Sequence, residues 1–403
     1  MPPPAADPIA RKQELWGKLY ERYRDPDRPH CLLALDGGGI RGILTLEVLC
    51  RMEELLAEAT GRGEGFRLCH FFDYVAGTST GAIIAAGLAR GMSARELLDF
   101  YRQTGPAMFD KAFILNRIRY LYKSEPLAKE LQQTYGADTD LFPKHLECLL
   151  LIVTRNVTTD SPWPISSNPE AKYNLPERAD CNLCIPLWQL VRASTAAPIF
   201  FAPEVLQWDK SDPAKHFVFV DGGMTPYNNP SLLLYRMATQ PAYKLGWKTG
   251  EQSLLLVSIG TGAAPTLGAD PSDPTQNAVS NLAGIPAALM YGAQVDQDIN
   301  CRTLGRCVYG APIDRELGDM IPRGDDGAAL PLDQDLGRAF LYLRYNAELT
   351  SPALNAWGMG DIDPAAVSRL DSVAHVDDLS RIGRRLGEEI RREHFGSFVE
   401  GRA

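Results

Sequence analysis

The sequence predicts an α/β fold with a mainly parallel central sheet flanked by helices. The prediction rests on short apolar runs, which indicate strands, and on the helical patterns that alternate with them. Short apolar runs alternate with longer segments in which apolar residues recur every three or four positions. Parallel strands need crossover connections, so strands that alternate with helices indicate a parallel sheet covered on both faces. No internal repeat interrupts this alternation.

The expected elements follow one another closely along the chain. Residues 31–35 should form a buried strand and residues 43–59 an amphipathic helix, and a second unit should place a strand at 71–76 and a helix at 80–89. Further strands are expected at residues 148–153, 217–220 and 254–259.

Both ends of the chain carry helical patterns. We expect residues 1–29 to contain a helix that packs on the core, and residues 263–403 to form a helical C-terminal extension of the same unit. This extension ends in an apolar stripe, for which we favour a core-facing helix over a partner-binding one. The stripe consists of Val376, Leu379, Ile382, Leu386 and Ile390.

Composition excludes several classes of protein. The 403 residues are 45% hydrophobic and 23% charged, as in globular proteins, and a formal charge of −9 leaves no broad positive field for nucleic acid. The apolar runs are shorter than the ~18 residues that a membrane-spanning helix needs. Residues 1–7 are not followed by the apolar core of a signal peptide, so a cytoplasmic protein is expected.

The eight cysteines are expected to be reduced, because they are too few for a disulfide framework in a chain of this length. Cys181 and Cys184 form a C-x-x-C pair, but a zinc site needs a second pair of ligands, and the spacing of Cys301 and Cys307 does not supply it. We therefore expect no metal.

A glycine-rich loop comes directly after the first expected strand. It reads Asp36-Gly37-Gly38-Gly39-Ile40-Arg41-Gly42 and precedes a helix, so bare backbone and a helix N-terminus together form an anion cradle. The loop also satisfies G-x-G-x-x-G, but dinucleotide binding needs an acidic residue on a second strand about 20 residues on. Residues 58–64 are instead a helix end and a turn, which disfavours that alternative.

The second motif is Gly77-Thr78-Ser79-Thr80-Gly81, between an expected strand and a helix of small residues. This arrangement predicts a nucleophile elbow that projects the Ser79 hydroxyl above the sheet. The alternative is a loop whose serine caps the helix.

The third motif, Asp221-Gly222-Gly223, ends the strand expected at 217–220 and places one carboxylate in a tight turn. Alone it would indicate an Asx-turn. Beside an elbow it supplies what a serine nucleophile needs, namely a base. The order of a Ser-Asp-His triad would require a histidine after Asp221, and neither His375 nor His394 has a convincing position.

Taken in order, these motifs resemble those of the patatin-like phospholipase family of lipid acyl hydrolases, over roughly residues 30–262. Two flanking segments are also similar, residues 192–198 and the triplet Asn228-Asn229-Pro230. The resemblance implies a patatin-type, hydrolase-like catalytic domain over 30–262 and a Ser79–Asp221 dyad without histidine. It further implies no cofactor, and an oxyanion hole formed by the Gly37, Gly38 and Gly39 amides with Arg41. Gly77, Gly81, Gly222 and Gly223 would shape the site.

The resemblance also implies a phospholipid or other acyl-lipid substrate, with peripheral membrane contact during catalysis. Some bacterial members are switched on by cyclic dinucleotides, so a cyclic nucleotide activator is a hypothesis, as is a homo-oligomer. The alternative function is a catalytically idle protein that senses a lipid or a nucleotide. Residues 108–122 mix apolar and basic side chains, which suits an interfacial lid, but we favour a helix packed on the core.

Overall fold

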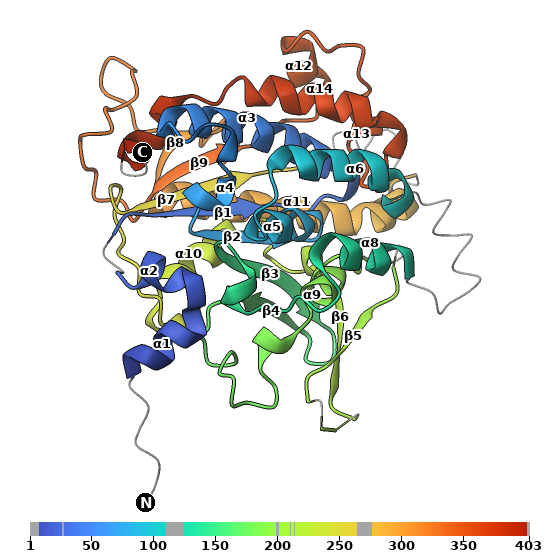
Figure 1. Ribbon diagram of the computed structural model, residues 1–403. Coiled ribbons are helices and arrows are strands. Elements are labelled where there is room, and N and C mark those ends of the chain that lie inside the picture. The colour runs from blue at the N-terminus through green and yellow to red at the C-terminus, as the bar shows by residue number, and fades with distance from the viewer. Residues whose placement is uncertain are drawn as a thin grey trace, which may run out of the picture.

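The computed structural model describes residues 8–25, 28–109, 125–198, 201–209, 211–212, 214–263 and 276–400. A mixed, mostly parallel sheet forms the centre, with strand order β5-β6-β3-β2-β1-β7-β9-β8 and β4 paired to β3 (Figure 1). Its strands are β1 (His30–Leu35), β2 (Tyr74–Thr78), β3 (Leu149–Asn156), β4 (Ser161–Ser166), β5 (Glu204–Gln207), β6 (His216–Asp221), β7 (Leu254–Ile259), β8 (Arg306–Tyr309) and β9 (Leu341–Tyr345). The predicted α/β class is confirmed.

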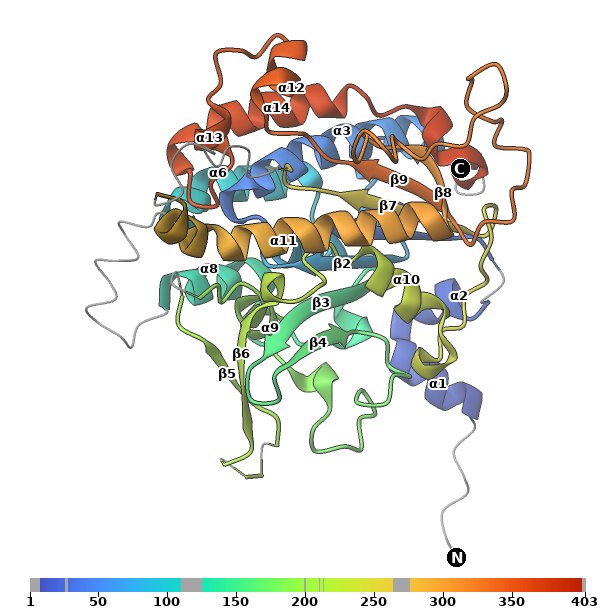
Figure 2. The same cartoon turned by 180° about the vertical axis from the view of Figure 1, so that it is seen from behind.

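Helices cover both faces of the sheet. One face carries α3 (Gly42–Thr60), α4 (Leu68–Phe71), α5 (Thr80–Ala89), α6 (Ala94–Phe109), α8 (Glu125–Tyr135), α9 (Leu187–Ser194), α12 (Ser351–Ala356), α13 (Pro364–Val367) and α14 (Val376–Gly387). The other face carries α1 (Pro8–Trp16), α2 (Tyr20–Tyr23), α10 (Ser231–Thr239) and α11 (Gln276–Leu304), and α11 runs across that face in Figure 2.

Side chains of the central strands alternate between two apolar cores. In β1, Leu33 and Leu35 belong to the core beneath α3, whereas Leu32 and Ala34 belong to the core beneath α10. Every residue of β1 is buried, as expected for a parallel strand covered on both faces. Near the N-terminus, three side chains are buried in the core beneath α10, namely Trp16, Leu19 and Tyr23.

The segment after residue 262, which we expected to be a helical extension, contains strands as well as helices. Leu379, Ile382 and Leu386 of the apolar stripe are buried on α14, which packs on α3 as expected, but the same segment also supplies β8 and β9. These strands were missed because β8 has only four residues and because Arg344 interrupts the apolar run of β9. β4 escaped prediction because it contains two prolines, which suit only an edge strand.

Strand β3 is longer than its neighbour β2, and the difference leaves space for another strand. β2 pairs with β3 as far as Val153, and β6 pairs with β3 from Thr154 onward. β4 occupies the opposite edge of β3 along this whole stretch, so β6 must lie on the edge that β2 has left. The C-terminal end of β6, at Asp221, therefore meets the C-terminal end of β2.

A buried ion pair joins the middle of the sheet across β7. Arg344 on β9 donates from Nη1 and Nη2 to Oδ1 and Oδ2 of Asp36, at 3.0 and 2.6 Å, and also donates to the Ser258 hydroxyl on β7 at 2.8 Å. Asp36 follows the last residue of β1 and is fully buried. Burial raises the pKa of Asp36, the Arg344 charge opposes that shift, and the bidentate contact fixes the start of the glycine loop.

Removing Arg344 should destabilise the protein strongly, because it leaves the Asp36 carboxylate buried and unpaired. We expect Arg344→Ala to lower the free energy of unfolding by about 3–5 kcal/mol in urea denaturation. The matched control is Arg381→Ala, since Arg381 forms an exposed pair with Asp361, and it should cost at most about 1 kcal/mol. Equal losses in the two variants would contradict a structural role for the buried pair.

Candidate active site

The turn between β2 and α5 has the geometry of a nucleophile elbow. Ser79 connects the two elements with φ 54° and ψ −120°, a conformation that non-glycine residues rarely adopt. The turn is tight on both sides: a Cβ atom on Gly77 would lie 2.1 Å from the Gly81 carbonyl oxygen, and one on Gly81 would lie 2.3 Å from the Leu35 carbonyl oxygen. The two flanking glycines are thus sterically required.

Ser194, at the end of α9, holds the elbow in place. The backbone N–H of Ser79 donates to Ser194 Oγ at 2.9 Å, and the Ser194 hydroxyl donates to the Val153 carbonyl at 2.6 Å. Through these two hydrogen bonds, the fully buried Ser194 links the strained turn to β3. Ser194 lies in residues 192–198, one of the two flanking segments that carry the family resemblance, and that resemblance implied no role for it.

Ser79 and Asp221 lie in direct contact. The Ser79 hydroxyl donates to Asp221 Oδ2 at 2.6 Å, while Oδ1 accepts the Gly223 N–H at 2.7 Å. Asp221 is also anchored through its backbone, because its N–H donates to the Ala196 carbonyl at 3.0 Å. The two side chains that the sequence selected 142 positions apart therefore meet where β2 and β6 end.

Burial raises the pKa of Asp221 to about 6, although the hydrogen bonds from Ser79 and Gly223 favour the ionised form. A carboxyl group of this pKa is mainly ionised at neutral pH, and it is a stronger proton acceptor than an ordinary aspartate. The contact with Ser79 can therefore move a proton as well as orient the hydroxyl.

The glycine loop lies against Ser79, but the Gly37 amide does not have the expected role. Gly37 contacts the nucleophile closely, since a Cβ atom there would lie 3.2 Å from Ser79 Cβ. Its N–H, however, already donates to the Asn228 carbonyl at 3.0 Å, so it cannot also bind an oxyanion. The amides of Gly38 and Gly39 have no acceptor within the described chain and remain for a ligand.

Arg41 braces this loop from within. It is buried, and its Nε and Nη1 atoms point to the carbonyl oxygens of Gly38 and Gly262 at 3.4 and 3.3 Å. Burial lowers the pKa of Arg41 to about 10, while the Asp36 charge opposes the shift, so the side chain stays cationic at neutral pH. Its contacts are those of a support for the loop.

Two residues outside the three motifs complete the support: Thr261, which the sequence did not indicate, and Asn228, from the flanking triplet. The carbonyl of Gly37 accepts the Thr261 hydroxyl at 2.9 Å and the Asn228 Nδ2 at 3.4 Å. Asn228 also explains Gly223, because a Cβ atom on Gly223 would lie 2.9 Å from Asn228 Oδ1. Gly222 is equally constrained, since its Cβ would lie 2.2 Å from the Val153 carbonyl oxygen.

The two histidines that follow Asp221 in the sequence have other partners. His375 Nδ1 lies 3.0 Å from Asp378, and His394 Nδ1 lies 2.8 Å from the Tyr345 hydroxyl. Burial lowers the pKa of His394 to about 4, so this side chain is neutral at physiological pH. The structure brings neither histidine to Ser79 and Asp221 by any recorded contact.

Other features of the sequence take no part in this site. Cys181 and Cys184 are free thiols, and no group of three or more His, Cys, Asp or Glu side chains among the described residues could hold a metal ion. Over the same ranges, no helix is long and apolar enough to cross a membrane. The segment considered as a lid has Met108 and Phe109 at the end of α6, and its residues 110–122 lie outside the described residues.

Comparison with known proteins places these motifs within one family. The family model for patatin-like phospholipase matches residues 33–235, half of the chain, and this span contains the glycine loop, Ser79 and Asp221. A cGAMP-activated phospholipase of Vibrio cholerae is 34% identical over 225 residues, which cover 53% of this chain and 58% of that protein. Patatin-15 of Solanum tuberosum is 29% identical over 244 residues, covering 57% and 60%.

An intracellular phospholipase A2 of Caenorhabditis elegans is 32% identical over 267 residues, which cover 63% of this chain but 22% of that protein. The chain thus spans less than two thirds of the length of the curated relatives it matches. Half of the chain, including all three motifs, matches the family model. The chain belongs to the patatin-like phospholipase family.

Proposed function

We propose that the chain is a serine lipid acyl hydrolase, a phospholipase A or esterase, in which Ser79 and Asp221 form a catalytic dyad. The observation that carries this proposal is the 2.6 Å hydrogen bond from the Ser79 hydroxyl to a buried carboxylate at a strained elbow. Family membership supports the reaction class, and the unengaged amides of Gly38 and Gly39 support an oxyanion hole beside the nucleophile.

The first half-reaction forms an ester on Ser79. As the Ser79 oxygen attacks the substrate carbonyl carbon, its proton passes to Asp221 Oδ2, and the carbonyl oxygen becomes an oxyanion that the Gly38 and Gly39 amides bind. Collapse of this intermediate breaks the bond to the alcohol. The Asp221 carboxyl group returns its proton to the departing alkoxide.

The second half-reaction releases the acid. Asp221, again ionised, accepts a proton from a water molecule that attacks the acyl group on Ser79, and the same amides bind the second oxyanion. When the carbon–oxygen bond to Ser79 breaks, the proton returns to the serine oxygen. These steps need no group besides the dyad, the loop and water.

The substrate is proposed to be a phospholipid or related acyl lipid, reached by peripheral contact with a membrane. Two exposed apolar side chains support this contact: Met224 directly follows Gly223, and Leu289 precedes Met290, whose methyl group lies against Gly223. Because the net charge is −9, docking through these side chains would depend little on anionic lipid.

Replacing either member of the dyad should abolish hydrolysis. With a short-chain p-nitrophenyl ester, we expect Ser79→Ala and Asp221→Asn each to reduce kcat by more than about 10³-fold, because each change disables the same step. Ser351→Ala and Asp325→Asn, at exposed positions, serve as matched controls and should retain full activity. Similar rates for wild type and Ser79→Ala would contradict the dyad and favour the idle sensing protein.

The activity should fall at acid pH because Asp221 must be ionised to act as a base. Since burial raises the pKa of Asp221 to about 6, kcat/KM should decline as pH drops through about 6 and should be level between pH 7 and 8. An ordinary histidine titrates nearby, so the profile must also be measured for His375→Asn and His394→Asn. Loss of the acid limb in either variant would reveal a histidine base instead.

We also propose that a cyclic dinucleotide activates the enzyme. The support is that two relatives, from Vibrio cholerae and Escherichia coli, are cGAMP-activated phospholipases at 34% and 31% identity. Addition of cyclic GMP–AMP should raise the rate of ester hydrolysis by about fivefold or more, with Ser79→Ala as the inactive control. An unchanged rate would contradict activation by a cyclic dinucleotide and would leave the hydrolase proposal intact.

A further inference from the structure

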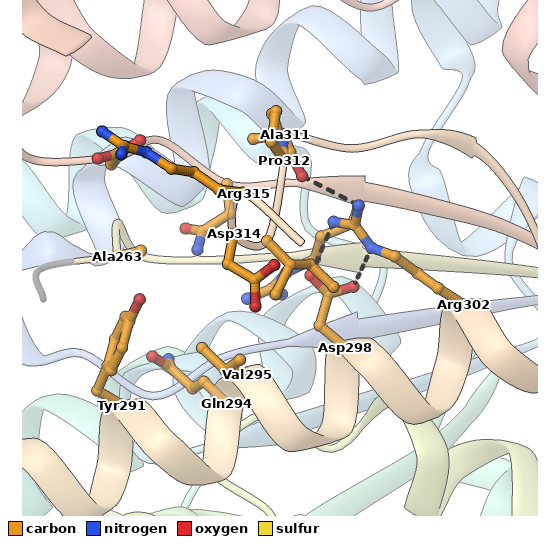
Figure 3. Close-up of a pocket in the computed structure, with 14 residues that line it drawn as sticks. Ala263, Tyr291, Gln294, Val295, Asp298, Arg302, Ala311, Pro312, Asp314 and Arg315 are labelled. Atoms are coloured by element: carbon orange, nitrogen blue, oxygen red, sulfur yellow. Dashed lines mark hydrogen bonds and ion pairs between the residues drawn. The ribbon is translucent and has the colours of Figure 1, made fainter. Parts of the chain in front are cut away.

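A pocket of about 460 Å³ opens beside α11, on the side of the sheet where the parallel strands end (Figure 3). Its walls come from α11, from Arg344 on β9 and from the segments that follow β7, β8 and β9, and neither Ser79 nor Asp221 lines it. The volume lies within the range of about 300–1,000 Å³ that is typical of sites for small organic ligands. Neither the dyad nor the glycine loop accounts for this cavity.

Two arginines in the wall are already neutralised. Arg302 donates from Nε and Nη2 to Asp298 at 2.9 and 2.8 Å, and Figure 3 shows this pair on one side of the pocket. Arg344 is held in the same way by Asp36. These pairs form rigid walls, and the charges they carry are not available to a ligand.

Two neutral amides in the wall are fixed in orientation and each has one free polar atom. Gln294 is 7% exposed and donates from Nε2 to Asp36 at 3.1 Å, so its Oε1 is left as an acceptor. Asn346 accepts the Gly262 N–H on Oδ1 at 2.9 Å, so its Nδ2 is left as a donor. The Asn346 donor and the Gln294 acceptor suit the hydrogen-bonding edge of a nucleobase. The half-buried ring of Tyr291, which lies on α11 with Gln294, suits the face of the base.

The charged side chains that can still pair with a ligand lie at the exposed rim of the pocket. Arg315 is exposed and has no ion pair in the part of the chain that the structure describes. Asp314 and Glu348 are also exposed, and each uses one carboxylate oxygen locally and keeps the other free. A phosphate would pair with Arg315, and sugar hydroxyls would donate to the carboxylates.

We propose that this pocket binds one nucleotide unit, with the base against Gln294 and Asn346 and the phosphate toward Arg315. A zwitterionic lipid headgroup is the weaker fit, because it would bring charge to the neutral inner wall. The assignment follows from which polar atoms are free and from where they lie.

The pocket is connected to the glycine loop by two short routes. Gln294 and Arg344 both hold Asp36, the residue directly before Gly37. Asn346 holds Gly262, whose carbonyl accepts Arg41. A ligand that moves Gln294 would shift Asp36, and one that moves Asn346 would shift Gly262 and Arg41. Both shifts would change the position of the glycine loop. This regulatory role rests on the proposed function, since the loop matters only if it binds the oxyanion.

Binding is best measured by calorimetry on the full chain carrying Ser79→Ala, because the result then does not depend on hydrolysis. We expect AMP or GMP to bind saturably at one site with a Kd near 1 mM or lower. Ribose 5-phosphate, which lacks the base, should bind at least about tenfold more weakly. Glycerophosphoethanolamine tests the headgroup alternative, and binding as tight as that of the nucleotide would overturn the proposal.

Two lining variants locate the site. Arg315→Glu and Tyr291→Ala should each weaken nucleotide binding at least about tenfold, or about 1.4 kcal/mol. The matched control is Arg392→Glu, which makes the same charge change at an exposed position outside the pocket and should bind as the parent does. Absence of nucleotide binding, or equal binding by all variants, would overturn the proposal.

The proposed effect of the bound nucleotide on hydrolysis is tested separately, with the wild-type protein. Saturating nucleotide should change kcat for a soluble ester by about fivefold or more. Nucleotide binding with an unchanged kcat would refute the coupling alone. Absence of hydrolysis by wild type would instead refute the proposed function, and the calorimetric result would stand independently of it.

Discussion

The candidate site depends on strand β3 being longer than β2. Because β2 stops opposite Val153 while β3 continues, β6 can pair with β3 at Thr154 and bring Asp221 to the end of β2. An antiparallel strand thus delivers the carboxylate from one direction and a parallel strand delivers the serine from the other. Ser194 reinforces this junction, since it bonds both to the Ser79 amide and to the Val153 carbonyl. The 2.6 Å contact between the two side chains follows from this pairing of backbones.

The glycine loop has a separate anchor, the buried pair of Asp36 and Arg344. The loop itself carries little side-chain surface, so its position must come from its ends and from neighbouring polar groups. Asp36 fixes one end through the pair, and Thr261 and Asn228 hold the Gly37 carbonyl. This arrangement leaves the Gly38 and Gly39 amides without an acceptor among the described residues, and Gln294 connects the same anchor to the pocket beside α11.

Motif residues were predictable from the sequence because their chemistry is local. Gly77 and Gly81 are needed for a turn of five residues, and Ser79 lies in the middle of it, so the order of residues reveals the elbow without tertiary information. The same holds for β1 and β7, whose continuous apolar runs mark strands buried on both faces. These predictions needed only strand and turn chemistry.

The remaining features depend on contacts between distant segments. Arg344 interrupts an apolar run, so β9 has no clear strand pattern, although the residue is compensated by Asp36 308 positions away. The engagement of the Gly37 amide by Asn228 likewise has no signature in either segment. The pocket beside α11 is assembled from the segments that follow three strands, two of which were not predicted. In each case the deciding partner lies too far along the chain for periodicity to show.

The central claim is that the buried carboxylate of Asp221 makes Ser79 a nucleophile. The most direct measurement is peptide mass mapping after reaction with an alkyl fluorophosphonate, which phosphonylates an activated serine oxygen with loss of fluoride. The account predicts one phosphonyl group, on the peptide that contains Ser79, and a much slower reaction in Asp221→Asn. A label on a different residue, or an unchanged rate in Asp221→Asn, would contradict it.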